Sequence, residues 1–244
     1  MKTIFFFIAV SLSGALNRVS SQTVPLQSIQ EEIAKAFYAS FADGNSTQLT
    51  VIADRLKPDS SSLALYWIAY AKYYESLFYL KTEHREKSAA AIHEGLEVLS
   101  KLKSKNSEDY ALLALMHNLS MKFTTDGMKF WELTGIINQN IEMAIQLDSN
   151  NLRAYYVAAS NDFYTPEQFG GGKKAEEYLL KAIMLDAQTN HDSALPSWGK
   201  DQSYQMLINV YLKNGNTASA KQYLKEAQTL FPDKDWQNIF KIFD

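Results

Sequence analysis

The sequence lacks cysteine altogether and contains only four histidines among its 244 residues. Without a thiol the chain has no disulfide framework and no attachment site for the lipid of a bacterial lipoprotein. The histidines are scattered, and no two of them have the one-turn spacing that lets two imidazoles face one metal ion. We therefore expect no metal site, no bound cofactor and no covalent cross-link.

An excess of positive charge is also absent. The 24 Lys and Arg residues are outnumbered by 27 Asp and Glu residues, and the formal net charge is −3. Proteins that bind nucleic acid usually carry a basic excess on at least one face, so nucleic acid is not expected as a partner. An apolar content of 46% with 21% charged residues is ordinary for a folded soluble protein.

Long apolar runs are missing except at the start of the sequence. Lys2 precedes the apolar segment 4–16, which is too short to span a bilayer. Small residues before Gln22 form a signal-peptidase site, and Ala15 ends a second candidate site. We expect residues 1–21 to be a signal peptide and the protein to be exported. A bacterial periplasm is the first expectation for its location, and secretion is the alternative. No stable membrane insertion is expected after cleavage.

Helical periodicity runs through most of the remaining chain. Apolar residues recur at intervals of three and four, and turn-forming clusters such as 43–45 and 214–216 separate the periodic stretches. No stretch alternates with the period of a strand. Ser61 and Ser107 stand where they can cap the helix that follows, and either Asn216 or Thr217 can cap the last predicted hairpin helix. The sequence predicts helices at 27–42, 46–56, 61–81, 85–103, 107–123, 131–147, 151–164, 173–187, 200–214 and 216–231, with a short one near 234–242.

The last complete helix pair follows the spacing of a known repeat. Its apolar, small and terminating positions are Tyr204, Leu207, Ile208, Tyr211, Ala220, Leu224, Ala227 and Pro232. This is nearly the whole pattern of a tetratricopeptide repeat (TPR), in which one hairpin buries its faces only by stacking on its neighbours. Weaker matches begin at Trp67, Tyr110 and Tyr155. Small residues in the same positions would let helix backbones approach closely: Ala71, Ala114, Ala159, Ala182 and Ala227.

We therefore expect an all-α fold, a right-handed superhelix of stacked antiparallel helix pairs with about five hairpins and a short C-terminal helix. Residues 22–60 are expected to form an irregular or capping hairpin, 61–232 the TPR-like repeats and 233–244 a capping helix.

Two segments resemble something more particular than a general repeat. Residues 164–175 read YTPEQFGGGKKA, and residues 196–202 read PSWGKDQ. Both are similar to segments of uncharacterised exported TPR proteins from Bacteroidetes-type bacteria, which carry a T-P-E-x-F-G-G-G-K turn and a P-x-W-G-K-x-Q entry to their final hairpin. The resemblance implies an exported repeat protein and brings no enzymatic activity and no binding residues.

Extra length at the turns around His84, 126–131 and 165–172 predicts insertions on one rim of the array, where repeat proteins often carry function. The three glycines of the last insertion permit a tight turn, and the amides of the next helix start could hold an anion. Alternatively, the turn docks Phe169 into the helices while the lysines face water. Trp198 is either an exposed platform or a ring packed over the preceding helices. The candidate rim residues are Phe169, Gly170, Gly171, Gly172, Lys173 and Trp198.

Catalytic patterns are weak throughout. The stretch from His93 resembles a zinc-protease helix, but Glu97 stands where the second imidazole is needed. Lys174 follows the Gly-Lys pair where a nucleotide-binding P-loop needs Ser or Thr. Ser197 with Lys200 matches a short serine–lysine pattern whose partner motifs are missing. We expect no enzyme.

The concave face is the expected binding surface, because the first helix of each pair lines it. The candidates, each of which is alternatively a solvated surface residue, are Lys72, Asn118, Arg153, Tyr156, Ser160, Gln205, Asn209 and Lys213. The leading hypothesis is a scaffold that binds a protein or peptide partner. The alternative is a small-ligand-binding accessory protein of an envelope transport system, with an apolar pocket near Trp67, Tyr74, Phe163 or Trp198. The sequence does not indicate an oligomeric state.

Overall fold

In the computed structural model, residues 25–187 and 192–236 are described, and they contain helices and no strand. The predicted all-α fold is therefore confirmed. The described helices are α1 (Ile29–Asp43), α2 (Thr47–Leu56), α3 (Ser62–Lys81), α4 (Arg85–Ser100), α5 (Ser107–Ser120), α6 (Gly127–Leu147), α7 (Leu152–Tyr164), α8 (Ala175–Met184), α9 (Lys200–Lys213) and α10 (Thr217–Leu230), with short 3-10 helices η1 (Met121–Phe123) and η2 (Glu167–Phe169).

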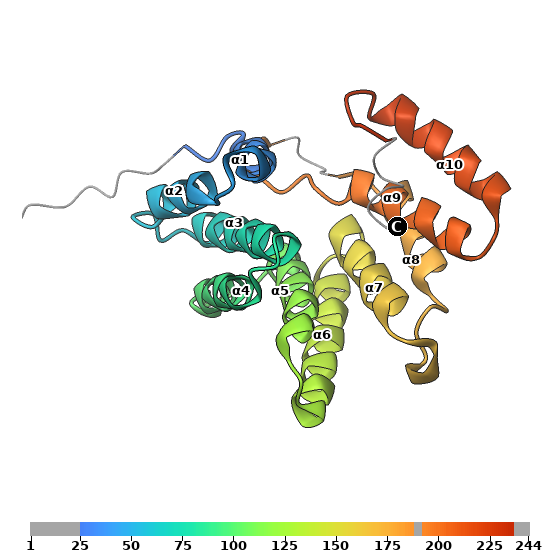
Figure 1. Ribbon diagram of the computed structural model, residues 1–244, viewed down its shortest axis with the longest axis horizontal. Coiled ribbons are helices and arrows are strands. Elements are labelled where there is room, and N and C mark those ends of the chain that lie inside the picture. Colours follow the sequence, from blue (N-terminus) through green and yellow to red (C-terminus); the bar gives the residue numbers. More distant parts are fainter. Residues whose placement is uncertain (1–24, 188–191, 237–244) are drawn as a thin grey trace, which may run out of the picture.

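The helices form antiparallel pairs that stack side by side in chain order, as predicted (Figure 1). The pairs are α1 with α2, α3 with α4, α5 with α6, α7 with α8 and α9 with α10. The first pair packs on α3, so it continues the stack. Within the described residues no helix is long and apolar enough to cross a membrane. The predicted signal peptide and most of the predicted C-terminal helix lie outside the described residues.

Side-chain caps set several helix starts. Ser61 accepts a hydrogen bond from the Ala64 amide at 3.2 Å, and Asn216 accepts one from the Ser219 amide at 3.1 Å, as predicted. The predicted cap at Ser107 is wrong, because Asn106 caps α5 together with the Asp109 carboxylate. The Ser107 hydroxyl instead donates to the Ala144 carbonyl at 2.7 Å and ties α5 to the end of α6.

The core combines aliphatic side chains with buried alanines and large aromatic rings. The five alanines predicted to let helix backbones approach closely are all buried. Trp67 is fully buried among them, and its indole NH donates to the Ala194 carbonyl at 2.9 Å. Close packing of this kind stabilises a helix array, because each buried ring removes a large apolar area from water.

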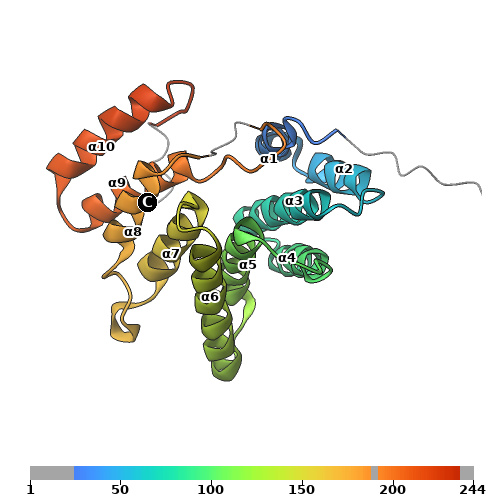
Figure 2. The ribbon, with the colours of Figure 1, turned by 180° about the vertical axis from the view of Figure 1, so that it is seen from behind.

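Part of the connection between α8 and α9 lies against the first hairpin. We call residues 192–199 the strap; it runs back along α1 and α3 (Figures 1 and 2). The Ser28 amide donates to the Ser193 carbonyl at 3.2 Å. The Gln30 side-chain oxygen accepts from the Ser197 amide at 2.8 Å and from the Trp198 amide at 3.1 Å. The strap therefore joins the two ends of the helix array.

One predicted rim insertion is a helix instead. Residues 127–131 form the first turns of α6, because Asp126 caps that helix by accepting hydrogen bonds from the Met128 and Lys129 amides. The Asp126-Gly127 pair resembles a turn signal, and here the aspartate acts as a helix cap.

Candidate functional site

The inner side of the array encloses a hollow made of two cavities. The cavity beside the strap has a volume of about 910 Å³, and the cavity beside the α7–α8 loop has a volume of about 470 Å³. We call them the strap cavity and the rim cavity. They share four lining residues: Tyr73, Leu77, Leu115 and Tyr156. Because the same side chains line both, the two cavities adjoin each other on the concave face, and we call the pair the hollow.

Aromatic rings from several helix pairs line the strap cavity. Tyr70, Tyr73 and Tyr74 follow one another on the inner face of α3, at helical spacings of three and four. The ring of Tyr70 stacks on Trp198 with centroids 5.5 Å apart, and Tyr156 meets Trp198 edge-on at 6.2 Å. These contacts give the cavity flat, preordered walls.

The phenols of α3 are held in their neutral form. The hydroxyls of Tyr70 and Tyr74 are 3.3 Å apart and share a hydrogen bond. Burial raises the pKa of Tyr74 to about 12 and raises the pKa of Tyr70 and of Tyr73 well above the ordinary value. At neutral pH these side chains are therefore hydrogen-bond donors without charge.

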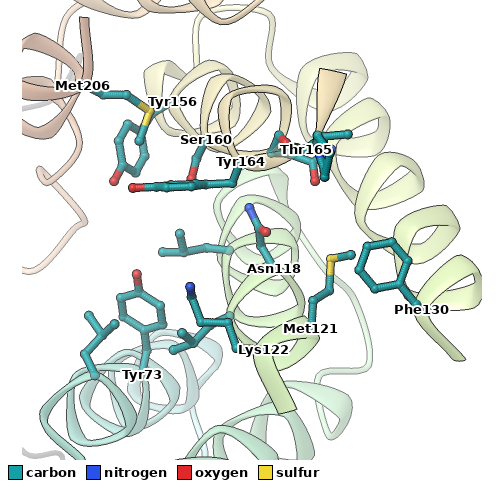
Figure 3. A pocket seen from close by; sticks show the side chains of 15 residues that line it. Tyr73, Asn118, Met121, Lys122, Phe130, Tyr156, Ser160, Tyr164, Thr165 and Met206 are labelled. Carbon is teal, nitrogen blue, oxygen red and sulfur yellow. Dashed lines mark hydrogen bonds between the residues drawn. The ribbon is translucent and has the colours of Figure 1, made fainter. Parts of the chain in front are cut away.

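The rim cavity combines an apolar lining with a small polar cluster (Figure 3). Tyr73 enters from α3, Asn118 and Lys122 enter from α5 and η1, and Tyr156 and Tyr164 enter from α7 (Figure 3). The apolar side chains around this cluster are Leu77, Leu115, Leu119, Met121, Phe130, Pro166 and Met206.

Some of the predicted concave-face residues meet in this hollow. Asn118, Tyr156 and Ser160 line the rim cavity, and Gln205 lines the strap cavity. Their shared placement follows from the helical spacing, because each residue lies beside the buried apolar face of the first helix in its helix pair.

Other predicted residues line neither cavity. The Lys72 ammonium is paired with Glu75 at 2.8 Å and with Glu94 at 2.7 Å, so it ties α3 to α4. Lys213 lies over the Phe163 ring at 5.2 Å, and Asn209 is half-buried on α9. These side chains are not part of the hollow.

Arg153 is the clearest departure from the predicted surface lining, because its side chain is only 5% exposed. Its guanidinium donates to both Glu108 carboxylate oxygens at 2.5 Å, and to the carbonyls of Ala187 and Trp198 at 3.0 and 3.1 Å. Burial alone would lower the pKa of Arg153, but its bonds and attraction to Glu108 raise that pKa above its ordinary value. Arg153 is therefore a buried residue whose hydrogen bonds link Glu108 of α5 to Trp198 of the strap.

The Trp198 ring is packed against neighbouring side chains and is not an exposed platform. The residue is 4% exposed, and its indole NH donates to the Tyr66 hydroxyl at 2.8 Å. The indole still contributes to the lining of the strap cavity. Of the other residues proposed around a pocket, Tyr74 lines the strap cavity, whereas the buried Trp67 and the half-buried Phe163 line neither cavity.

The α7–α8 loop, residues 165–174, forms the tight turn expected from its glycines. Gly170 and Gly172 have φ angles of 90° and 77°, a region that glycine adopts without strain. A Cβ atom on Gly171 would lie 1.9 Å from the Thr165 carbonyl oxygen, so the loop closes only around glycine there.

The start of α8 is already occupied by an internal anion. The amides of Lys174 and Ala175 both donate to one carboxylate oxygen of Asp162, each at 2.8 Å. This favours the turn interpretation of the glycine run over the anion site. Lys173 faces water, as that interpretation expects. The docking of Phe169 into the helices, expected with that turn, is wrong, because Phe169 is 54% exposed and meets the exposed Trp131 edge-on at 5.8 Å.

Sequence reasoning missed Tyr70, Tyr73, Tyr164 and Lys122 as parts of one site. The tyrosine-rich stretch of α3 was a usable signal, because its spacing puts several rings on one helix face. Within the described residues, no group of three or more His, Asp or Glu side chains is placed to hold a metal ion.

No protein-family model and no curated protein matches this sequence. Among solved structures, the chain is similar to TTC0263, a thermophilic TPR protein of Thermus thermophilus. The TM-score is 0.56 at 16% identity, over 88% of this chain and 96% of that one. It is also similar to the HusA haemophore from Porphyromonas gingivalis. That TM-score is 0.53 at 19% identity, over 76% of this chain and 94% of the other. These similarities show a TPR-like fold.

Proposed function

We propose that this protein is a non-catalytic binding protein that holds a compact, flat and largely apolar ligand in the hollow. The observation that carries the proposal is the pair of adjoining cavities of about 910 and 470 Å³, which tyrosine and tryptophan rings line. Ligand sites are typically concave and apolar with a few converging polar groups, and cavities of this size suit molecules of a few hundred daltons. Flat rings gain additional stabilisation by stacking on aromatic walls.

The strap supports a compact ligand over an extended peptide. A groove for an extended chain is open at both ends, whereas here the strap bridges α9 and α1 (Figure 1), and its Ser197 and Trp198 line the strap cavity. A porphyrin is the first ligand to test, since one protein of similar fold is named a haemophore. That similarity concerns the fold, so the ligand class rests on the cavity walls of this chain.

Titration with haemin and with a pyrene carboxylate, followed by ligand absorbance and tryptophan quenching, tests the proposal. Tyr156→Ala should weaken binding about tenfold or more, because it removes a ring that lines both cavities. Tyr155→Ala is the matched control, since the neighbouring Tyr155 is equally half-buried but faces Tyr178 of α8.

The control should change affinity by less than about twofold, given that its ring lies outside the hollow. Absence of saturable binding for both probes would refute the proposal. Equal losses in the two variants would show that the hollow is not the site.

A protein or peptide partner is the second candidate, and the exposed Trp131–Phe169 pair favours it. These rings are 61% and 54% exposed, and large exposed aromatic groups often mark interaction surfaces. A partner recovered by crosslinking in envelope extracts should be lost with the double variant Trp131→Ser and Phe169→Ser and retained with Tyr156→Ala. Recovery that is indifferent to the rim variant would reject this candidate.

Export completes the proposal, as suggested by Lys2, the apolar segment 4–16 and the small residues that follow. Cell fractionation should place the mature protein in the periplasm or the medium, starting at Gln22 or Leu16. An uncleaved chain in the cytoplasm would contradict it.

A further inference from the structure

The rim cavity has one charged lining residue, and that charge is positive. Of the 15 residues around it, Lys122 alone carries a charged side chain. Among the described residues Lys122 makes no ion pair, and its ammonium lies 6.0 Å from the centre of the Tyr164 ring. Its backbone is fixed by a hydrogen bond from Arg85 to the Lys122 carbonyl. Lys122 is exposed, and its ammonium group lies beside an otherwise uncharged, largely apolar lining.

Neutral hydrogen-bond donors accompany this ammonium group. The hydroxyls of Tyr73, Tyr156 and Tyr164 make no hydrogen bond with other described residues, and neither does the Asn118 amide. Burial raises the pKa of all three phenols, so they remain protonated at neutral pH. Figure 3 shows the Tyr73 side chain rising toward those of Tyr156 and Tyr164, with the Lys122 nitrogen between the two helices.

The strap cavity has no comparable preference for an anion. Lys81 and Lys234 line it together with Asp201, Asp233 and Asp235, and Lys234 is paired with Asp201. Charges of both signs line that end, so it has no exclusively positive lining to attract an anionic group. The two ends of the hollow therefore differ in charge, which gives a ligand one favoured orientation.

We infer that the ligand carries a carboxylate, which Lys122 and Asn118 anchor in the rim cavity while its flat apolar body extends between Tyr73 and Tyr156 toward the strap cavity. One ammonium group neutralises one negative charge, which suits a carboxylate better than a doubly charged phosphate. Tyrosine hydroxyls and the Asn118 amide supply the remaining donors that a carboxylate accepts. This inference rests on the proposed function and specifies the ligand that the hollow takes.

The test compares pyrenebutyric acid with its methyl ester, which has the same ring but no charge. Binding is followed by pyrene fluorescence for the full chain and for Lys122→Met, which keeps the apolar stem of the side chain. The acid should bind the unchanged protein about tenfold or more tightly than the ester, as expected for a charge-assisted hydrogen bond. In Lys122→Met this difference should shrink to less than about threefold, through weaker binding of the acid alone.

Lys221→Met removes an exposed lysine from α10 outside both cavities and should leave the preference for the acid intact. Circular dichroism and the melting temperature verify that each variant folds, and Lys122→Gln replaces Lys122→Met if the latter does not.

Equal binding of acid and ester to the unchanged protein would overturn the carboxylate inference while leaving the proposed function standing. A preference that survives in Lys122→Met would overturn the role of Lys122. Failure of both the acid and the ester to bind would overturn this inference, and failure of haemin as well would refute the proposed function.

Discussion

Replacing Arg153 by Met should destabilise the protein more than the removal of a charge from an exposed side chain, because Arg153 is buried and links Glu108 to the strap. The substitution removes two short hydrogen bonds to Glu108 and leaves the Ala187 and Trp198 carbonyls without their donor. Breaking a buried ion pair from one side costs about 3–5 kcal/mol, since the remaining charge stays partly desolvated. Glu108 is 24% exposed and regains some water, which places the expected loss near the lower limit, about 3 kcal/mol.

Urea denaturation and calorimetry measure this loss. For a chain of this size, a loss of about 3 kcal/mol corresponds to a fall of about 6–12 °C in the melting temperature. Glu108→Gln and the double variant complete a double-mutant cycle, in which the pair should show a coupling free energy above about 1 kcal/mol.

The matched control is Arg55→Met, which breaks the pair between Arg55 and Glu32. That pair has similarly short bonds, at 2.8 and 2.5 Å, but its side chains are 43% and 45% exposed. Screening by water limits such a pair to about 0–1 kcal/mol. Equal losses of unfolding free energy in Arg153→Met and Arg55→Met would refute the claim that burial makes the Arg153–Glu108 pair important for stability. Additive effects of Arg153→Met and Glu108→Gln would refute it as well.

Two further predictions concern the rim loop and the tyrosine cluster. Gly171→Ala should cost about 1–3 kcal/mol of unfolding free energy in urea denaturation, since its Cβ would lie 1.9 Å from the Thr165 oxygen. Gly135 lies in the middle of α6, where a new Cβ would meet no atom of another segment within 4 Å, so Gly135→Ala should stabilise the protein by about 0.5–1 kcal/mol. An unchanged free energy of unfolding in Gly171→Ala would contradict the close approach of Gly171 to Thr165. Alkali should also unfold the protein, because the pKa of Tyr74 is raised from 10.0 to about 12 by burial. The unfolded state loses this proton at lower pH than the folded state does. The contribution of Tyr74 to the free energy of unfolding is therefore fully present below about pH 10 and is lost between about pH 10 and 12. Phenolate absorbance and circular dichroism should change together; ionisation of all tyrosines near pH 10 in a protein that stays folded would refute the burial argument.

Helix positions were largely predictable, since the signals are local. A helix is recognised from apolar residues three and four apart and from the residues at its ends. The largest error is the start of α6, predicted at 131 and observed at Gly127, because Asp126 caps a helix where its sequence resembles a turn. Ser107 shows the same limit, as the neighbouring Asn106 is the cap.

The candidate site was predicted in part. Asn118, Tyr156 and Ser160, which were predicted for the concave face, line the rim cavity, since helical spacing puts them beside the buried apolar face of their helix. Arg153 has the same spacing but is buried, because Glu108 and the strap approach it from segments far along the chain. Lys122 was not distinguished from other surface lysines, as nothing near it in sequence shows that its neighbours in the cavity carry no charge.

By itself, then, the order of amino acids determined the all-α class, the pairing of consecutive helices and the glycine turn at 170–172. Each depends on interactions between residues close together in the chain. Tertiary structure alone decided that the strap returns to α1, that Trp198 of the strap is buried, and that two cavities adjoin at Tyr73 and Tyr156. The physical reason is that a cavity depends on the angles at which helix pairs stack and on contacts across more than a hundred residues, such as the bond between Trp67 and Ala194.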